Sequence, residues 1–255
     1  MKLLRAILDF YINTSIHVAI AVFSLVQITK IALNISTNVN LDWFIFFGTI
    51  ISYNFLKYCE VFRNKVYTIK KNYDVIIVSF FACIGLCLCL LKVENNILIE
   101  LLKIGFLVLF YPLLRKFWFL KMFVVAFTVT YITYYIPCIS CNFNWIYFGQ
   151  RFVLIICLLI PLEIVDLPQD TKTIRTLPKI IGIGNLKKVG YFLLIVFCFL
   201  DLYFLKLNFE IDIVIAIIIA FFIFNASNKV SKYYTSFWVE SIPIVLLLFY
   251  YLLRL

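Results

Sequence analysis

Charged side chains are scarce in this chain. Asp, Glu, Lys and Arg make up 14% of its 255 residues, whereas hydrophobic residues make up 65%, and the mean hydropathy is +1.05. A soluble domain is about half apolar and about a quarter charged, so an ordinary soluble domain is excluded. The apolar tracts approach the length of about 20 residues that a transmembrane helix needs, and they do not alternate as barrel strands do. The sequence therefore predicts an all-α, polytopic membrane helical bundle.

Glycine, proline and histidine are also few. Seven Gly and six Pro leave little room for long flexible linkers, so residues 1–255 are expected to form one integral membrane domain. Gly182 and Gly184 lack the rest of a dinucleotide-binding fingerprint and any preceding strand, which excludes that function. Histidine occurs once, as His17, and a lone buried His is expected to be structural and hydrogen-bonded.

The eight Cys residues lie mostly in apolar runs, where Cys packs as a small hydrophobe. Cys138 and Cys141 have the spacing of a metal or redox motif. A zinc site needs further ligands, and a chain with one His offers few. A disulfide at the outer face is another alternative, and simple packing is the interpretation that we favour.

The apolar tracts predict nine transmembrane spans. The first, which includes Ser15 to Leu33, has no small-residue cleavage site after it, so we interpret it as a helix rather than a signal peptide. The nine predicted spans are 14–34, 42–58, 74–92, 97–114, 119–137, 145–165, 189–207, 210–227 and 236–254.

Basic residues alternate between the two ends of these spans. With the N-terminus inside, 17 of the 23 Lys and Arg residues fall in or beside inner segments, and the loops at 35–41 and 138–144 carry no charge. The positive-inside rule therefore predicts an N-in, C-out topology, in the inner membrane of the cell. The net charge of +10 also suits contact with anionic lipid head groups. Nucleic acid is a poor alternative partner, because the charges form short clusters at the membrane without a recognition motif.

The two largest inner segments, 59–73 and 166–188, each follow an even-numbered span. Asn54 and Asp166 are four spans apart. This spacing predicts a pseudo-repeat of helices 1–4 and helices 5–8, followed by a ninth helix.

A cluster of charges interrupts the apolar sequence at "LEIVDLPQDTKTIRTLP", residues 162–178. Glu163, Asp166 and Asp170 stand at i, i+3 and i+7, which on a helix share one face, although Pro168 argues against an unbroken helix. A charge at the centre of a span costs roughly 2.5–3.5 kcal/mol, and less near its end. Carboxylates at this spacing can hold Mg²⁺ beside a phosphate. Two interpretations stay open on spacing alone: a site for a phosphorylated substrate at the cytoplasmic face, or a solvated loop.

Residues 162–182 resemble the second aspartate motif of the UbiA superfamily of intramembrane prenyltransferases. That motif has an aspartate pair spaced D-x-x-x-D, then basic residues, then Thr-Leu-Pro and a Gly. A second segment, "YPLLRKFWFLKMFVVAF", resembles the family's Tyr-Pro segment before helix 5, and Glu240 with Ser241 stands at the family's acidic step into helix 9. Nine spans and an N-in topology also agree with the family. The matching residues are Tyr111, Pro112, Arg115, Lys121, Asp166, Asp170, Lys172, Arg175, Thr176, Leu177, Pro178 and Gly182.

The resemblance implies a prenyltransferase mechanism. Mg²⁺ held by Asp166 and Asp170 would bind an isoprenyl diphosphate, and metal and cations would stabilise the departing pyrophosphate. The apolar interior would shelter the chain, and a lipophilic acceptor such as a quinone precursor or another lipid would attack. The residues expected to bind the substrate are Tyr111, Arg115, Lys121, Lys172 and Arg175.

The first aspartate motif of the family, roughly N-D-x-x-D-x-x-x-D, is altered here to "NFLKYCEVF". Asn54 is retained, but Phe55, Tyr58 and Phe62 stand where acids are expected. Glu60 is the nearby carboxylate, about 240° from Asn54 on a helix.

An active enzyme requires Asn54, Glu60, Asp166 and Asp170 to converge. The alternative is a catalytically inactive UbiA-like membrane protein that binds a lipid or a partner. A transporter is less favoured, because its helices are often broken by Gly or Pro at mid-membrane, whereas these acids lie at the inner mouth.

Overall fold

The computed structural model describes residues 2–36, 38–63, 72–114, 120–139, 143–167, 176–205 and 209–252, and within these ranges it contains helices and no strands. The prediction of an all-α bundle is confirmed. The α-helices are α1 (Lys2–Asn13), α2 (Ile16–Leu33), α3 (Val39–Arg63), α4 (Tyr73–Leu90), α5 (Asn95–Leu114), α6 (Leu120–Thr130), α7 (Trp145–Asp166), α8 (Leu177–Ile181), α9 (Ile183–Leu200), α10 (Phe209–Asn225) and α11 (Ile242–Leu252). The described residues also contain three π-helical segments: η2 (Tyr131–Tyr135) after α6, η3 (Asp201–Leu205) after α9, and η4 (Tyr234–Val239) before α11.

Seven helices in the described part of the chain are long and apolar enough to cross a membrane. This is the pattern of a polytopic, membrane-embedded helical bundle. Two further tracts for which spans are predicted form shorter apolar helices: α6 continued by η2, and α10, which has 17 residues. The seven are Ile16–Leu33, Val39–Tyr58, Tyr73–Leu90, Asn95–Leu114, Trp145–Asp166, Ile183–Leu205 and Tyr234–Leu252.

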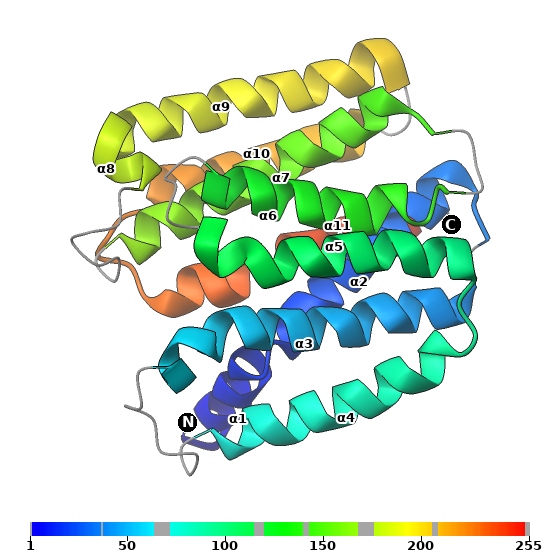
Figure 1. The fold of residues 1–255 in the computed structure, drawn as a ribbon. Coiled ribbons are helices and arrows are strands. Elements are labelled where there is room, and N and C mark those ends of the chain that lie inside the picture. The colour runs from blue at the N-terminus through cyan, green and yellow to red at the C-terminus, as the bar shows by residue number, and fades with distance from the viewer. Residues whose placement is uncertain are drawn as a thin grey trace.

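The long helices run side by side along one axis (Figure 1). The largest cluster of buried residues joins α2, α6, α7, α9, α10 and α11. A Cβ atom on Gly190 of α9 would lie 2.9 Å from Cδ1 of Ile223 and 3.1 Å from Cδ1 of Ile160, so glycine here lets α9 pack closely on α10 and α7. One member of the cluster from each of the six helices is, in order, Leu25, Met122, Ile160, Leu194, Ile219 and Leu246.

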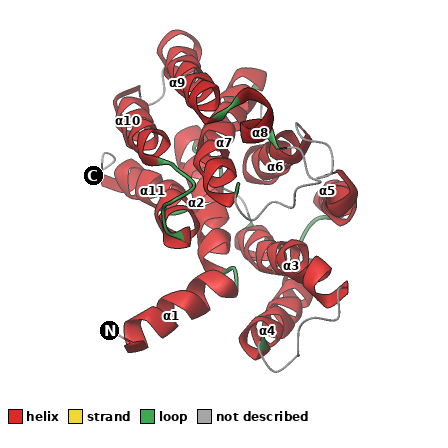
Figure 2. Cartoon of the chain, turned by 90° about the vertical axis from the view of Figure 1, so that its left-hand side faces the viewer, coloured by secondary structure: helices red, strands yellow, loops and turns green. Residues whose placement is uncertain are grey.

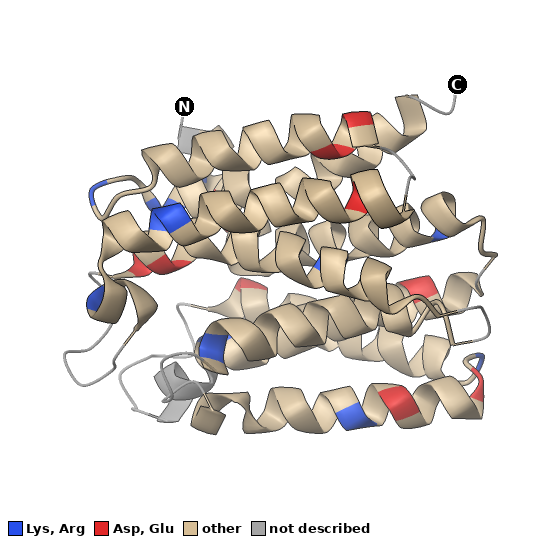
Figure 3. Ribbon diagram, turned by 90° about the horizontal axis from the view of Figure 1, so that it is seen from above, with Lys and Arg blue, Asp and Glu red and all other residues tan. Residues whose placement is uncertain are grey.

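The outer surface of the bundle is also apolar. Phe80 on α4, Phe106 on α5 and Ile195 on α9 are 62%, 61% and 68% exposed. Apolar surface this extensive is unusual for a soluble monomer and is typical of a surface that meets lipid. Figure 3 shows the described Lys and Arg residues mostly toward the left-hand end of the bundle and Asp and Glu mostly toward the right-hand end.

His17 has the structural role expected from the sequence. The residue is 1% exposed, its Nε2 lies 3.0 Å from the carbonyl oxygen of Phe237, and its ring stacks on the Phe237 ring. These contacts hold α2 against η4, so the prediction of a hydrogen-bonded structural histidine is confirmed.

The helix α1 has no counterpart among the predicted spans. It has 12 residues, too few to cross a membrane. Ser15, with φ of 62°, breaks the helical backbone between α1 and α2. Figure 2 shows the result: α1 is seen from the side and projects outward from the bundle at the lower left, while α3, α9 and α10 are seen nearly end-on.

Candidate functional site

A large cavity of about 970 Å³ lies between α2, α3, α5, α6 and α7. This volume is at the upper end of the range, roughly 300–1,000 Å³, in which small-molecule sites fall. Most of its wall is aliphatic or aromatic. Examples from successive helices are Val22, Phe44, Leu101, Val125 and Leu159.

The charged side chains of the cavity gather at one end. The C-terminal halves of α3, α5 and α7, the start of α6, and η4 lie at this end because neighbouring helices run in opposite directions (Figure 1). We call this end the polar mouth. It comprises Tyr53, Lys57, Tyr111, Lys121, Glu163, Asp166 and Glu240, all of which line the cavity.

Lys121 and Glu163 form an ion pair across the mouth, with 2.8 Å between Nζ and Oε1. The Glu163 side chain is 7% exposed and that of Lys121 is 24% exposed, so the pair joins α6 to α7 at a largely desolvated position. The sequence predicts Lys121 as a phosphate partner. In the structure its ammonium group already neutralises a neighbouring carboxylate.

Glu163 and Asp166 both line the cavity, as expected for residues three positions apart on a helix. Asp166 is the last residue of α7 and is partly exposed. Arg115, Asp170, Lys172 and Arg175 lie outside the described residues. Glu60 belongs to α3, but its side chain also lies outside the described part of the structure.

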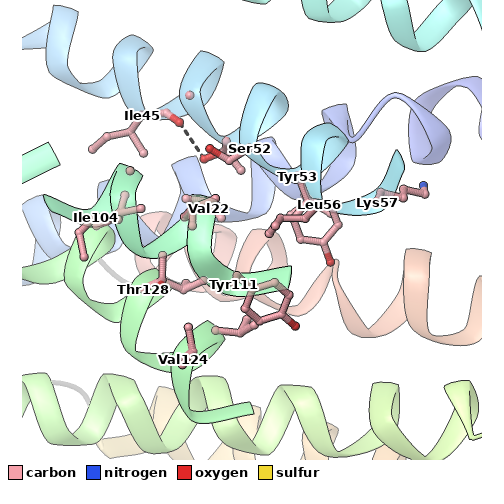
Figure 4. A pocket seen from close by; sticks show the side chains of 18 of the residues that line it. Val22, Ile45, Ser52, Tyr53, Leu56, Lys57, Ile104, Tyr111, Val124 and Thr128 are labelled. Carbon is pink, nitrogen blue, oxygen red and sulfur yellow. Dashed lines mark hydrogen bonds between the residues drawn. The ribbon is translucent and has the colours of Figure 1, made fainter. Parts of the chain in front are cut away.

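Tyr53 and Glu240 connect two distant parts of the chain. The Tyr53 hydroxyl lies 3.4 Å from Oε1 of Glu240, which follows η4 directly. In Figure 4, Tyr53 and Tyr111 approach the mouth from facing helices, and their hydroxyl groups reach the same side.

The π-helical turn of η4 explains how Glu240 reaches the cavity. Its backbone N–H donates to the carbonyl oxygen of Thr235, five residues earlier, at 3.2 Å. On an α-helix two residues with this separation would point about 140° apart. Thr235 and Glu240 both line the cavity, because the wider turn brings them to one side. Such π turns are frequent at functional sites.

Asn54 does not appear among the described residues that line the cavity. It is 4% exposed, and its Oδ1 accepts a hydrogen bond of 2.7 Å from the Ser15 hydroxyl. Its Nδ2 donates to the Thr14 carbonyl oxygen at 3.2 Å and to the Ser79 hydroxyl at 2.9 Å. The side chain thus holds the break between α1 and α2 against α4.

We expect Asn54→Ala to lower the free energy of unfolding by about 1–3 kcal/mol, because it leaves buried polar groups without their partner. Equilibrium unfolding in detergent measures this. The control is Asn185→Ala, which removes an exposed amide that bonds the Ile181 carbonyl oxygen, and which should change stability by less than about 0.5 kcal/mol. Full stability of the Asn54 variant would show that this hydrogen-bond network contributes little to the fold.

The described residues alone do not form a Mg²⁺ site. No group of three or more His, Cys, Asp or Glu side chains within the described ranges is placed to hold a metal ion. Of the implied ligand pair, Asp166 lines the cavity, and Asp170 is beyond the described residues. Glu163 is paired with Lys121, and Asn54 is part of the hydrogen-bonded α1–α2 junction.

Tyr53, Lys57 and Glu240 belong to the mouth, although the sequence does not assign them to it. Tyr53 and Lys57 are four residues apart, a spacing that places them on one face of α3. This spacing can be seen in the sequence. The position of Glu240 depends on the π turn, which apolar periodicity does not reveal.

Comparison with known proteins found no relative of this chain. No model of a protein family matches the chain, and no curated protein and no solved structure matches it. The motif residues and the geometry of the cavity are therefore the features that bear on its function.

Proposed function

We propose that this protein is a UbiA-like integral membrane prenyltransferase with nine spans, an N-in and C-out topology, and its site at the cytoplasmic face of the inner membrane. One observation carries the proposal: a single cavity combines a long apolar body with a mouth that bears acidic, basic and phenolic side chains. This is the shape and polarity that an isoprenyl chain with a charged head group requires. The concentration of Lys and Arg toward one end of the bundle supports the orientation.

The apolar body has room for an extended chain. Lining residues run along α3 from Phe44 to Lys57 and along α5 from Leu98 to Tyr111. Each stretch advances about 20 Å at the helical rise of 1.5 Å per residue. The isoprenyl chain would lie between these helices, and the apolar wall would keep water from the reacting carbon.

The diphosphate head would lie at the polar mouth. In the transfer, the bond between the allylic carbon and the diphosphate oxygen breaks, and the electron pair leaves with the diphosphate. A nucleophilic carbon or oxygen of the lipophilic acceptor bonds to the allylic carbon and loses a proton. Lys57 would attract the leaving diphosphate, and the rings of Tyr53 and Tyr111 would supply electron density beside the developing cation.

A second candidate function is binding without catalysis. Two observations favour it: acids of the first motif are replaced, and Asn54 is engaged at the α1–α2 junction. In that case the cavity would hold a prenyl lipid or another long-chain amphiphile, and no bond would be broken.

An assay in lipid nanodiscs separates the two functions. Labelled prenyl diphosphates of several chain lengths are supplied with a lipid extract as acceptor, with Mg²⁺ or with a chelator. We expect Mg²⁺-dependent transfer, and we expect Asp166→Asn to reduce it about 100-fold or more, because charge stabilisation of this kind is worth several kcal/mol.

Asp74→Asn is the matched control, since Asp74 is an exposed aspartate in the first turn of α4. Its turnover should equal that of the unmodified protein. Binding of prenyl diphosphate without any turnover would favour the non-catalytic function. The absence of both binding and turnover would exclude prenyl diphosphates as ligands.

A further inference from the structure

The helix α1 has two faces of opposite character. Leu3, Leu4, Ile7 and Phe10 recur at helical spacing and form one apolar stripe, and Asp9 lies on the opposite face. The stripe is largely uncovered, with exposed fractions of 76%, 65%, 56% and 40% in that order.

The polar face of α1 is attached to the protein. The Tyr233 hydroxyl donates a hydrogen bond to Oδ1 of Asp9. At the end of the helix, Nζ of Lys57 lies 3.4 Å from the Ile12 carbonyl oxygen, and the Tyr58 hydroxyl donates to the Asn13 carbonyl oxygen at 3.2 Å. These contacts fix which way α1 is rotated, and they leave its apolar stripe facing outward.

The direction of α1 matches the plane of a membrane surface. In Figure 2 it is seen from the side and projects outward from the bundle, whereas α3, α9 and α10 are seen nearly end-on, so α1 runs transverse to the long helices. The first apolar helix of spanning length, α2, starts at Ile16, immediately after the break at Ser15. The helix α1 is therefore held at the level where the bundle enters the lipid.

We propose that α1 is an interfacial helix, lying in the membrane plane with its apolar stripe inserted at the boundary between lipid head groups and acyl chains. The occupant of the stripe is lipid rather than a second copy of the chain, because α1 is joined through the short break at Ser15 to α2, the first apolar helix of spanning length, and so lies near the level where the bundle would enter a bilayer. Short amphipathic helices with a polar face toward water bind membranes in this way.

This placement also concerns the cavity. Ile12, in the last turn of α1, lines it, so α1 forms part of the rim of the polar mouth. A helix embedded at the lipid surface would determine how deep in the membrane this rim lies. An amphiphile could then pass from the membrane into the cavity without its chain crossing water.

Site-specific photocrosslinking tests the proposal. Benzoyl-phenylalanine is introduced at Leu4, or at Asn13, which is nine residues away and therefore about 180° around the helix. Both side chains are exposed. The proteins are reconstituted in vesicles of phosphatidylethanolamine and phosphatidylglycerol and irradiated, and adducts are identified by mass spectrometry.

We expect lipid adducts at Leu4 to exceed those at Asn13 by about tenfold or more. Equal yields at the two positions, or adducts at Leu4 mainly with another copy of the protein, would overturn the proposal. Thermal unfolding of each variant checks its fold, and Ile7 on the same stripe replaces Leu4 if that variant is unstable. The experiment needs no substrate, so its outcome is independent of the proposed prenyltransferase activity.

Discussion

Gly105→Phe is expected to weaken the binding of prenyl diphosphates at least about 100-fold, which corresponds to about 2.7 kcal/mol. Gly105 lies near the middle of the α5 stretch that lines the cavity. A Cβ atom there would meet no atom within 4 Å, so a large side chain can enter the open space without displacing a neighbour. The phenyl ring would occupy the volume that an isoprenyl chain needs.

Binding to the protein in nanodiscs, measured by titration with a labelled prenyl diphosphate, gives the affinity. Gly149→Phe is the control, because Gly149 also has no atom within 4 Å of an added Cβ but does not belong to the described lining of the cavity. The control should bind like the unmodified protein. Unchanged affinity in Gly105→Phe would mean that the ligand binds elsewhere or that the cavity is not its site.

Lys30→Met is expected to lower the free energy of unfolding by about 3–5 kcal/mol, because it leaves a buried carboxylate without its cation. Nζ of Lys30 lies 2.6 Å from Oδ2 of Asp42, and the two side chains are 15% and 5% exposed. The Gln27 amide also donates to this oxygen at 3.0 Å. Together these bonds hold α2 to α3 far from the polar mouth.

Equilibrium unfolding in mixed micelles measures the loss. The double variant Lys30→Met with Asp42→Leu should regain most of the stability, because replacing both members of a buried pair by apolar residues is often neutral or stabilising. A loss below about 1 kcal/mol in the single variant would show that solvent screens the pair, as it does for surface ion pairs.

The helical bundle could be predicted because hydropathy and length decide which segments can span a bilayer. The helix α1 could not be predicted in this way. Its 12 residues are too short for a span, and its amphipathic pattern gives a helix on the bilayer surface rather than through it. The tracts of α6 and α10 are clearly apolar, so the sequence predicts a span for each. In the structure their helices are shorter than the seven long ones.

The polar mouth was predictable only where its residues are close in sequence. Glu163 and Asp166 share a face of α7, and their spacing showed it. The pairing of Lys121 with Glu163 depends on how α6 packs on α7, and no local pattern encodes it. The position of Glu240 at the mouth depends on the π turn of η4. The hydrogen bonds of Asn54 depend on the backbone break at Ser15.

The contacts of η4 bear on the order in which the protein is assembled. His17 on α2 meets the Phe237 carbonyl oxygen, and Tyr53 on α3 meets Glu240, across separations of 220 and 187 residues. During synthesis the N-terminal parts of a chain emerge first. These groups of α2 and α3 can therefore meet their partners in η4 only after nearly the whole chain has been made. Thr235, Ser236 and Glu240 line the cavity, so a chain interrupted before η4 would lack this part of the cavity wall.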